Sequence, residues 1–286
     1  MNRHMGQVVC AVAVAAALLA VPTGARAGYT SGFEALSASP TGVILTGQDG
    51  YTLPSGTDFN VYTYAGNAPG FPANPLGGAQ FIAGTGPGGG VYARAERSVD
   101  YSTASLWTLS FDVAAKYLGD PQATPGNNVG SISLQPSASS TSTIALARWS
   151  TPGVSWQADY VWYDAAGTSI TESVPDPGFQ NLQLDHWYNW ATTFDLASNQ
   201  IVKVSITDLS TNTTASYSPT DRYLQTGSAH SMPDPTAFRF FAGGGNPGGN
   251  TMAFDNIQIE PPPPSGDIPE PATMALLGLA VTGLGG

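Results

Sequence analysis

The sequence predicts an all-β fold, a sandwich of two antiparallel sheets, for residues 28–260. Apolar and polar residues alternate along short segments, and clusters of Gly, Pro and Asn separate these segments. Charged residues make up only 10% of the chain and aromatic residues another 10%, which indicates a packed core and not a disordered chain. No long segment of helical period interrupts this pattern, so we expect one large domain without helices.

The expected strands follow one another at short intervals. Segment 105–113 shows the alternation most clearly, because Trp107, Leu109 and Phe111 share one face. We expect segments 186–196 and 200–209, joined by a tight turn, to form a hairpin at the centre of the fold. The other expected strands are 32–37, 43–46, 58–64, 79–83, 91–99, 129–135, 143–149, 155–164, 170–174, 236–242 and 252–260.

The first 27 residues have the features of a secretory signal peptide. Arg3 gives a positively charged start, residues 8–21 are continuously apolar, and Ala27 ends a small-x-small pattern. We therefore expect signal peptidase to cleave between Ala27 and Gly28. Cys10 is the only cysteine and lies in this segment, so the exported chain is expected to contain no disulfide.

The other end of the chain carries a second addressing signal. A stiff Pro-rich linker, 261–267, leads to the triplet Pro269, Glu270 and Pro271, and an uncharged apolar run, expected to be helical, continues to Gly286. Residues 268–286 resemble the PEP-CTERM sorting signal, which exosortase-type transpeptidases read on exported proteins of Gram-negative bacteria. The resemblance implies that the tail holds the chain in the membrane before processing. The family ends in a basic cluster that is missing here, so we expect a truncated or degenerate signal.

The charge balance limits the expected partners. Two of the nine basic residues lie in the signal peptide, so seven remain in the exported chain beside twenty acidic ones. An acidic surface disfavours nucleic acids and anionic membranes. It is compatible with a neutral polysaccharide or with divalent cations.

Three short motifs carry a second resemblance. They are Gly-Phe-Glu at 32–34, His-Trp-Tyr-x-Trp at 186–190 followed by Phe-Asp-Leu at 194–196, and Phe-Asp-Asn-Ile at 254–257. In this order they resemble secreted domains of the concanavalin A-like lectin/glucanase superfamily. The resemblance implies a jelly-roll sandwich.

No catalytic motif is recognisable in the sequence, so we expect no enzyme. No Glu has an Asp two positions ahead with another Glu beyond, and no Ser/His/Asp grouping occurs. Glu96 and Asp100 share a strand face at a spacing of about 13 Å, which is long for glycoside hydrolysis. Arg94 and Arg97 lack the histidine partner of a polysaccharide lyase. A hydrolase or lyase remains the alternative, because carboxylates from different strands can meet.

Two carboxylates are candidate metal ligands. Glu34 follows Phe33 near the start, and Asp255 shares its face with Ile257 near the end. First and last strands often pair in such folds, and a buried carboxylate needs a partner or a cation. We therefore predict a structural Ca²⁺ held by Glu34, Asp255 and nearby carbonyl oxygens. The alternative is that Asp255 caps backbone amides and Glu34 is solvated.

The densest group of aromatic residues is the candidate carbohydrate-binding platform. Trp156, Tyr160 and Trp162 share one face of a strand and Tyr163 lies on the other, so only one set can be exposed. Aromatic residues at this period are more often part of a core. The sequence thus predicts a non-catalytic protein of the cell surface or extracellular matrix, with a polysaccharide as its expected ligand.

Overall fold

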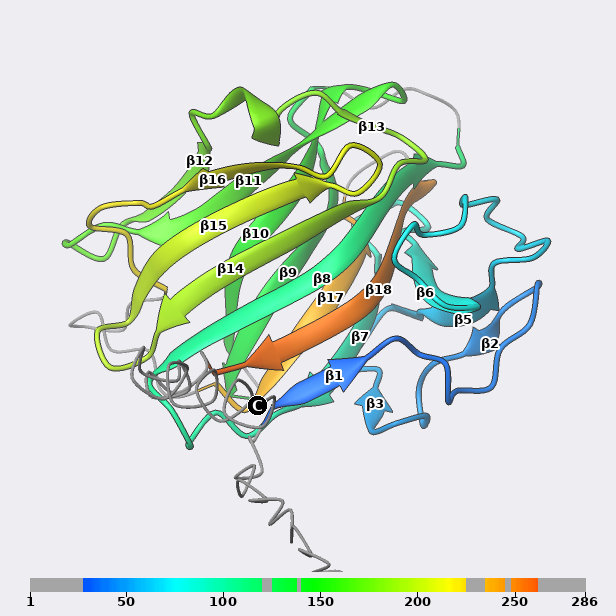
Figure 1. The fold of residues 1–286 in the computed structure, drawn as a ribbon, viewed down its shortest axis with the longest axis horizontal. Coiled ribbons are helices and arrows are strands. Elements are labelled where there is room, and N and C mark those ends of the chain that lie inside the picture. The colour runs from blue at the N-terminus through cyan, green and yellow to red at the C-terminus, as the bar shows by residue number, and fades with distance from the viewer. Residues whose placement is uncertain (1–27, 120–124, 138–139, 225–234, 245–247, 262–286) are drawn as a thin grey trace, which may run out of the picture.

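The computed structural model describes residues 28–119, 125–137, 140–224, 235–244 and 248–261. The predicted signal peptide, its cleavage site at Ala27, and the sorting triplet at 269–271 with the apolar tail lie outside these residues. The described chain forms two sheets packed face to face (Figure 1). The predicted all-β sandwich is therefore confirmed.

The first sheet lies toward the viewer in Figure 1. It has the strand order β16-β15-β14-β8-β18-β6-β5-β2, and β1 also pairs with β18. Its nine strands are β1 (Tyr29–Ser31), β2 (Val43–Ile44), β5 (Asn60–Thr63), β6 (Gln80–Thr85), β8 (Leu106–Tyr117), β14 (Tyr188–Asp195), β15 (Gln200–Asp208), β16 (Thr213–Tyr217) and β18 (Asn250–Glu260).

The second sheet lies behind the first. It has the order β12-β11-β10-β9-β17-β7-β3, with β13 paired to β11 and β4 running parallel to β7. Its strands are β3 (Tyr51–Thr52), β4 (Thr57–Asp58), β7 (Tyr92–Ser98), β9 (Asn128–Ser137), β10 (Ser140–Thr151), β11 (Ser155–Tyr163), β12 (Ser169–Ser173), β13 (Leu182–Gln183) and β17 (Ala237–Gly243).

The chain crosses repeatedly between the two sheets. It passes from β6 in the first sheet to β7 in the second, returns in β8, and crosses again for β9 to β13, for β14 to β16, for β17 and for β18. Such crossings place strands that are distant in sequence side by side, as in the pair of β8 with β18. This connectivity is that of a jelly-roll type of sandwich.

Alternation along the strands builds the core. Tyr188, Trp190, Thr192 and Phe194 of β14 are buried, and the residues between them are partly exposed. Aromatic rings from the two sheets meet at the centre, where the centroids of Phe240 and Phe254 are 4.4 Å apart. Because each apolar face is covered by the other sheet, the described chain needs no disulfide to bury its core.

Two expectations about the strands are wrong. Segment 32–37 is not a strand, because Phe33 takes a left-handed conformation (φ 63°) and a turn follows in which the Leu36 amide donates to the Phe33 carbonyl. The hairpin of β14 and β15 forms as predicted, but β15 lies next to the edge strand β16, and β8 and β18 occupy the middle of the sheet.

Helical structure is limited to one turn in the described chain. This is the 3₁₀ helix η1 (Pro177–Phe179), which lies between β12 and β13. None of the described segments forms a helix of the length and apolarity needed to cross a membrane. The pairing of β1 with β18 confirms that the first and last strands are neighbours.

Candidate functional site

A cleft opens where the η1–β13 segment faces β15 and β16. Its volume is about 440 Å³. It is named the Tyr188 cleft here, and it is lined by Asp176, Gly178, Gln180, Asn181, Leu182, Gln183, Tyr188, Ile206, Asp208, Thr211, Thr213, Thr214 and Ala215.

The cleft has an apolar floor and polar walls. Leu182, Tyr188 and Ile206 are at most 5% exposed and form the floor. Exposed amide side chains line one wall and exposed threonines the other, namely Gln180, Asn181 and Gln183 opposite Thr211, Thr213 and Thr214. Such a surface offers both donors and acceptors to a ligand that is rich in hydroxyl groups.

Local sequence chemistry fixes the η1–β13 wall. The Asp176 Oδ1 atom accepts the Gly178 amide at 2.8 Å and caps η1, while Phe179 is fully buried and anchors the turn. Gly178 packs against Ala215 of β16 so closely that a Cβ atom would clash. Asn181 has φ 54°, a conformation that Asn adopts more readily than most residues.

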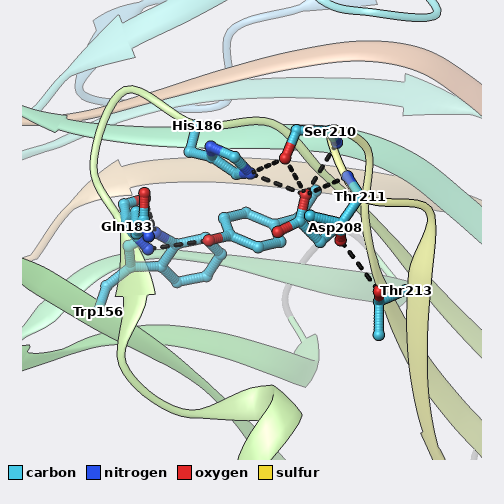
Figure 2. Close-up of polar contacts among 8 residues, drawn as sticks. Trp156, Gln183, His186, Asp208, Ser210, Thr211 and Thr213 are labelled. Atoms are coloured by element: carbon cyan, nitrogen blue, oxygen red, sulfur yellow. Dashed lines mark hydrogen bonds and ion pairs between the residues drawn. The ribbon is translucent and has the colours of Figure 1, made fainter.

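Buried aromatic side chains hold Gln183 in place. Its amide donates to the Tyr188 hydroxyl at 2.9 Å, and its carbonyl accepts the Trp156 indole N–H at 3.1 Å (Figure 2). The two rings meet edge to face at 5.8 Å. Both backbone groups of Gln183 are thus satisfied from below, and its exposed side chain faces the cleft.

Burial raises the pKa of Tyr188, and the nearby charge of Asp208 raises it further, although the Gln183 amide partly offsets both effects. The phenol is therefore neutral at ordinary pH. Its oxygen already accepts the Gln183 amide, so its proton is left for a ligand or solvent acceptor.

Asp208 ends β15 on the rim of the cleft. Its Oδ1 atom contacts the His186 Nε2 atom at 2.8 Å and accepts the Ser210 hydroxyl at 2.7 Å, and the amides of Ser210 and Thr211 donate to it at 2.8 and 3.2 Å (Figure 2). Burial on its own would raise the pKa of this carboxyl. The hydrogen bonds outweigh burial and lower the pKa to about 2.

The structure thus brings together a serine, a histidine and an aspartate, a grouping that the sequence did not reveal. The contacts are not those of a catalytic triad, in which the histidine holds the serine through one ring nitrogen and the carboxylate through the other. Here Ser210 and Asp208 both contact the same Nε2 atom of His186, at 3.2 and 2.8 Å. Ser210 donates its proton to Asp208, so the cluster stabilises a turn.

The two predicted metal ligands lie beside the same pair of glycines. A Cβ atom on Gly77 would be 2.7 Å from the Asp255 Oδ2 atom, and one on Gly78 would clash with Glu34. Glu34 is exposed and accepts the backbone amides of residues 79 and 80 at 2.8 and 3.1 Å. The expectation that the Glu34 side chain points inward is wrong, because the left-handed turn at Phe33 redirects the chain.

Asp255, by contrast, is fully buried, but not on the predicted face. A bulge between Asp255 and Gln258 places it opposite Asp112, whereas Ile257 lies in the core between the sheets. The Asp255 carboxylate accepts the Tyr64 hydroxyl at 2.8 Å, an Asn74 amide N–H at 3.2 Å and the Asn256 backbone amide at 2.8 Å. Burial raises the pKa of Asp255 to about 7 against these hydrogen bonds, and the nearby Asp112 contributes to the rise. No group of three Asp, Glu, His or Cys side chains in the described chain is arranged to hold a metal ion. The Ca²⁺ site stays a prediction.

Asp112 of β8 completes this buried cluster. The side-chain amides of Asn74, Asn189 and Asn256 each donate to its carboxylate at 2.8 Å. Asn74 also reaches Asp255, so one amide bridges the two carboxylates. Sequence patterns did not identify Asp112 as part of a site, because its partners come from three separate segments.

The predicted aromatic platform is corrected by the structure. Trp156, Tyr160 and Trp162 have no exposed surface and face the other sheet, where Tyr160 accepts a hydrogen bond from the Trp190 indole N–H. Rings in the core are inaccessible to a sugar. Tyr163 lies on the opposite, partly exposed side of β11, and its role in binding stays a prediction.

Two of the other charged candidates, Glu96 and Arg97, are engaged in ion pairs, whereas Arg94 donates to the Ser55 hydroxyl and Asp100 accepts the Ser102 amide. Arg239 makes two hydrogen bonds to Glu96, and Arg97 pairs with Asp49 at 3.3 Å while its guanidinium lies over the Tyr29 ring. These contacts tie neighbouring strands together.

Comparison with protein families identifies the tail. The family described as the PEP-CTERM protein-sorting motif matches residues 267–286. The chain is therefore an exported protein of the cell envelope, and the motif implies exosortase-type processing. No curated protein matches the chain.

Three solved structures with a similar arrangement of strands share only 12–13% sequence identity with this chain. The cellulose-induced protein Cip1 has 12% identity and a TM-score of 0.45, over 81% of this chain and 96% of that one. A CBM2 module of the evolved Dit protein of Lactobacillus casei BL23 phage J-1 has 13% identity and a TM-score of 0.45, over 82% of this chain and 96% of that one. A carbohydrate esterase of the Shiga toxin-encoding bacteriophage phi24B has 12% identity and a TM-score of 0.44, over 78% of this chain and 97% of that one. Likenesses this weak say nothing about the ligand of this chain.

Proposed function

We propose that this protein is a non-catalytic component of the surface or extracellular matrix of a Gram-negative bacterium, and that it binds a neutral polysaccharide in the Tyr188 cleft. Signal peptidase would remove residues 1–27. An exosortase-type transpeptidase would then recognise Pro269, Glu270 and Pro271. The sandwich would face the outside of the cell, where polysaccharide is available.

The lining of the cleft carries the proposal. Exposed amides stand opposite exposed threonine hydroxyls, above a floor that contains one aromatic ring and two aliphatic side chains. Sugars present hydroxyl groups around apolar ring faces, so they match walls that hydrogen-bond and a floor that does not. The volume of about 440 Å³ lies within the range of pockets that enclose a small ligand.

The charges near the cleft favour a neutral ligand. Asp176 and Asp208 both line it, and Asp208 stays ionised at ordinary pH because its pKa is about 2. A uronate or sulfate group placed here would be repelled. A neutral sugar hydroxyl could donate to either carboxylate.

Paired substitutions on the amide-bearing wall test the proposal. Asn181→Gly keeps the left-handed backbone and removes an amide, and Gln183→Ala removes a second one without touching the buried aromatic contacts. We expect the double variant to lose at least about tenfold in affinity for its polysaccharide in affinity-gel and glycan-array measurements, since each lost hydrogen bond costs about 1 kcal/mol.

The matched control lies at the opposite end of β15. Asn199→Gly with Gln200→Ala removes the same two side-chain types, and Asn199 also has a positive φ of 56°. This control should bind like the unchanged protein. Equal binding by both double variants, or no binding of neutral glycans by the unchanged protein, would refute the proposal.

A glycoside hydrolase is the second candidate, because two carboxylates line the cleft. Both already accept hydrogen bonds from the protein, Asp176 from the Gly178 amide and Asp208 from His186 and from two residues of its own turn, Ser210 and Thr211. A hydrolase would release reducing ends from a bound oligosaccharide, and Asp208→Asn would abolish the release. Binding without release would leave the non-catalytic proposal.

A further inference from the structure

A second, smaller hollow lies next to the Tyr188 cleft. It has a volume of about 180 Å³ and is named the Pro72 pocket here. Its lining combines two exposed prolines and a small side chain with polar groups, namely Pro72, Ala73, Pro75, Asp185, His186, Trp187 and Ser210. At this size the pocket is too small to enclose a typical ligand by itself, so it fits an extension of a neighbouring site.

The cleft and the pocket share one wall. Asp208 lines the cleft, and its partners His186 and Ser210 line the pocket. The contacts that join them are 2.8 and 2.7 Å long (Figure 2). The two hollows are therefore separated by a single layer of hydrogen-bonded side chains, which forms a polar ridge between them.

The far wall of the Pro72 pocket is held in place. The Trp187 indole N–H donates to the Pro72 carbonyl at 2.8 Å. Lys116 donates to the Gly70 carbonyl at 3.0 Å and forms an ion pair with Asp185 at 2.9 Å. These contacts fasten the loop that carries Pro72 and Pro75 to the segment before β14 from two sides, so the pocket needs little ordering when a ligand binds.

We propose that the ligand of the Tyr188 cleft is a linear polysaccharide chain that continues over the His186–Asp208–Ser210 ridge into the Pro72 pocket. The inference rests on the proposed function and specifies its ligand class, a neutral unbranched glycan of more than two sugar units. The ridge presents the exposed Ser210 hydroxyl and the partly exposed His186 ring to the chain where it crosses. Asp176, Asp185 and Asp208 lie along this path and disfavour an anionic chain.

Dependence of affinity on chain length tests the inference. The probes are neutral oligosaccharides of one to six units, with α-1,4-glucan, β-1,3-glucan, β-1,4-glucan and β-1,4-mannan linkages, and polygalacturonate serves as an acidic comparison. Isothermal titration with the full exported chain should show affinity rising about tenfold between two and four units of the preferred series and then levelling off. Polygalacturonate should not bind.

A variant of the Pro72 pocket separates this inference from the proposed function. Ala73→Leu adds a branched side chain to the exposed wall of the pocket, and Ala68→Leu makes the same change at an exposed position of the same loop outside it. We expect Ala73→Leu to remove the gain with chain length while disaccharide binding stays the same, and Ala68→Leu to change neither.

Each outcome decides between the two proposals. Affinity that does not depend on length, or equal behaviour of the two leucine variants, would overturn the extended path and leave the glycan cleft standing. Absence of binding by every neutral series would overturn the proposed function, and the extended path with it. Binding of polygalacturonate in preference to the neutral series would contradict the ligand class in both.

Discussion

Asp208 and Asp255 lie in the same sheet and accept comparable sets of hydrogen bonds, but their pKa values are shifted in opposite directions from the ordinary value of an aspartate. At the exposed rim, hydrogen bonds from His186, Ser210 and Thr211 outweigh burial and lower the pKa of Asp208 to about 2. In the interior, burial outweighs hydrogen bonds from Tyr64, Asn256 and Asn74 and raises the pKa of Asp255 to about 7.

The comparison shows that counting donors does not predict the charge of a carboxyl group. Access to water and the sign of the neighbouring charge decide the outcome. Asp208 faces a histidine and solvent, whereas Asp255 shares the Asn74 amide with a second carboxylate, Asp112. The surroundings of Asp208 thus stabilise its charged form. Ionisation of the buried Asp255, by contrast, lowers the free energy of unfolding.

The largest expected effect is on the pH dependence of stability. The pKa of Asp255 is higher in the folded chain than in the unfolded chain, so its contribution is most favourable below about pH 4 and is lost as the pH rises to about 7. The difference corresponds to roughly 4 kcal/mol at 1.36 kcal/mol per pKa unit. With chelator present, urea unfolding at several pH values should show this decline, and Asp255→Asn should flatten it.

Asp208 provides the opposite sign within the same experiment. Its pKa is lower in the folded chain, so its stabilising contribution is present above about pH 4 and is lost as the pH falls toward 2. In Asp208→Asn, the part of the stability that the unchanged protein loses between pH 4 and pH 2 through Asp208 should be absent at every pH. The decline in stability between pH 4 and 7 should stay unchanged. If both variants changed the same pH range, the contrast between rim and interior would be wrong.

The next effect concerns the amides around Asp112. Asp112→Ala leaves Asn74, Asn189 and Asn256 without their acceptor in a buried site, and we expect the free energy of unfolding to fall by about 3 kcal/mol or more. Asp208→Ala, made on the partly exposed rim, should cost less, roughly 2 kcal/mol, in line with the lowering of its pKa to about 2. Urea denaturation at neutral pH measures both, and equal losses would contradict the difference in burial.

Calcium is expected to have an effect of intermediate size, which involves Asp255 and not Asp208. If Glu34 and Asp255 hold a structural Ca²⁺, the cation will favour the ionised form of Asp255 and lower its pKa. A hundredfold excess over the dissociation constant would stabilise the fold by about 2.7 kcal/mol. Calorimetry with calcium or with excess chelator measures this, and an unchanged melting temperature would reject the site.

The smallest expected effect is on the rim. His186→Asn should raise the pKa of Asp208 partway toward its ordinary value, because the Ser210 and Thr211 donors remain. Stability should fall by only about 0.5–1 kcal/mol, as for a partly exposed pair. An NMR titration follows the carboxyl groups, with Asp164 as an internal control, since its pKa is lowered by turn amides without a histidine. An unchanged Asp208 would show that the histidine has no role there.

Much of the fold follows from the period of the sequence, because alternation reports which side of a strand is buried. The strands β8, β14, β15 and β18 lie where the pattern of apolar residues predicts them. Asp255 is buried as predicted, but the reason given from the sequence is wrong. A bulge between Asp255 and Gln258 places Asp255 opposite Asp112, on the face away from Ile257, where Tyr64 and Asn74 cover it. β16 was missed because its exposed, Thr-rich segment at the edge of the sheet carries no apolar stripe.

The candidate site could not be predicted in the same way. The cleft is lined by polar residues from turns and a strand edge, which have no period, and Asp208 meets His186 only through the register of the β14–β15 hairpin. The aromatic platform was misplaced because alternation places Trp156 and Trp162 on one face without saying whether the other sheet covers that face. The orientation of Glu34 depended on one left-handed residue, Phe33.

The most direct test of glycan binding in the Tyr188 cleft is an NMR titration of the isotope-labelled protein with its preferred neutral oligosaccharide. Backbone amide shifts should change at Asn181, Gln183, Thr211, Thr213 and Thr214, which line the two walls. Ser110 and Gln258, in a separate polar hollow on the outer face of the first sheet, should not respond. Shifts centred on Ser110 and Gln258, or no shifts at the cleft when binding is saturated, would contradict glycan binding in the cleft.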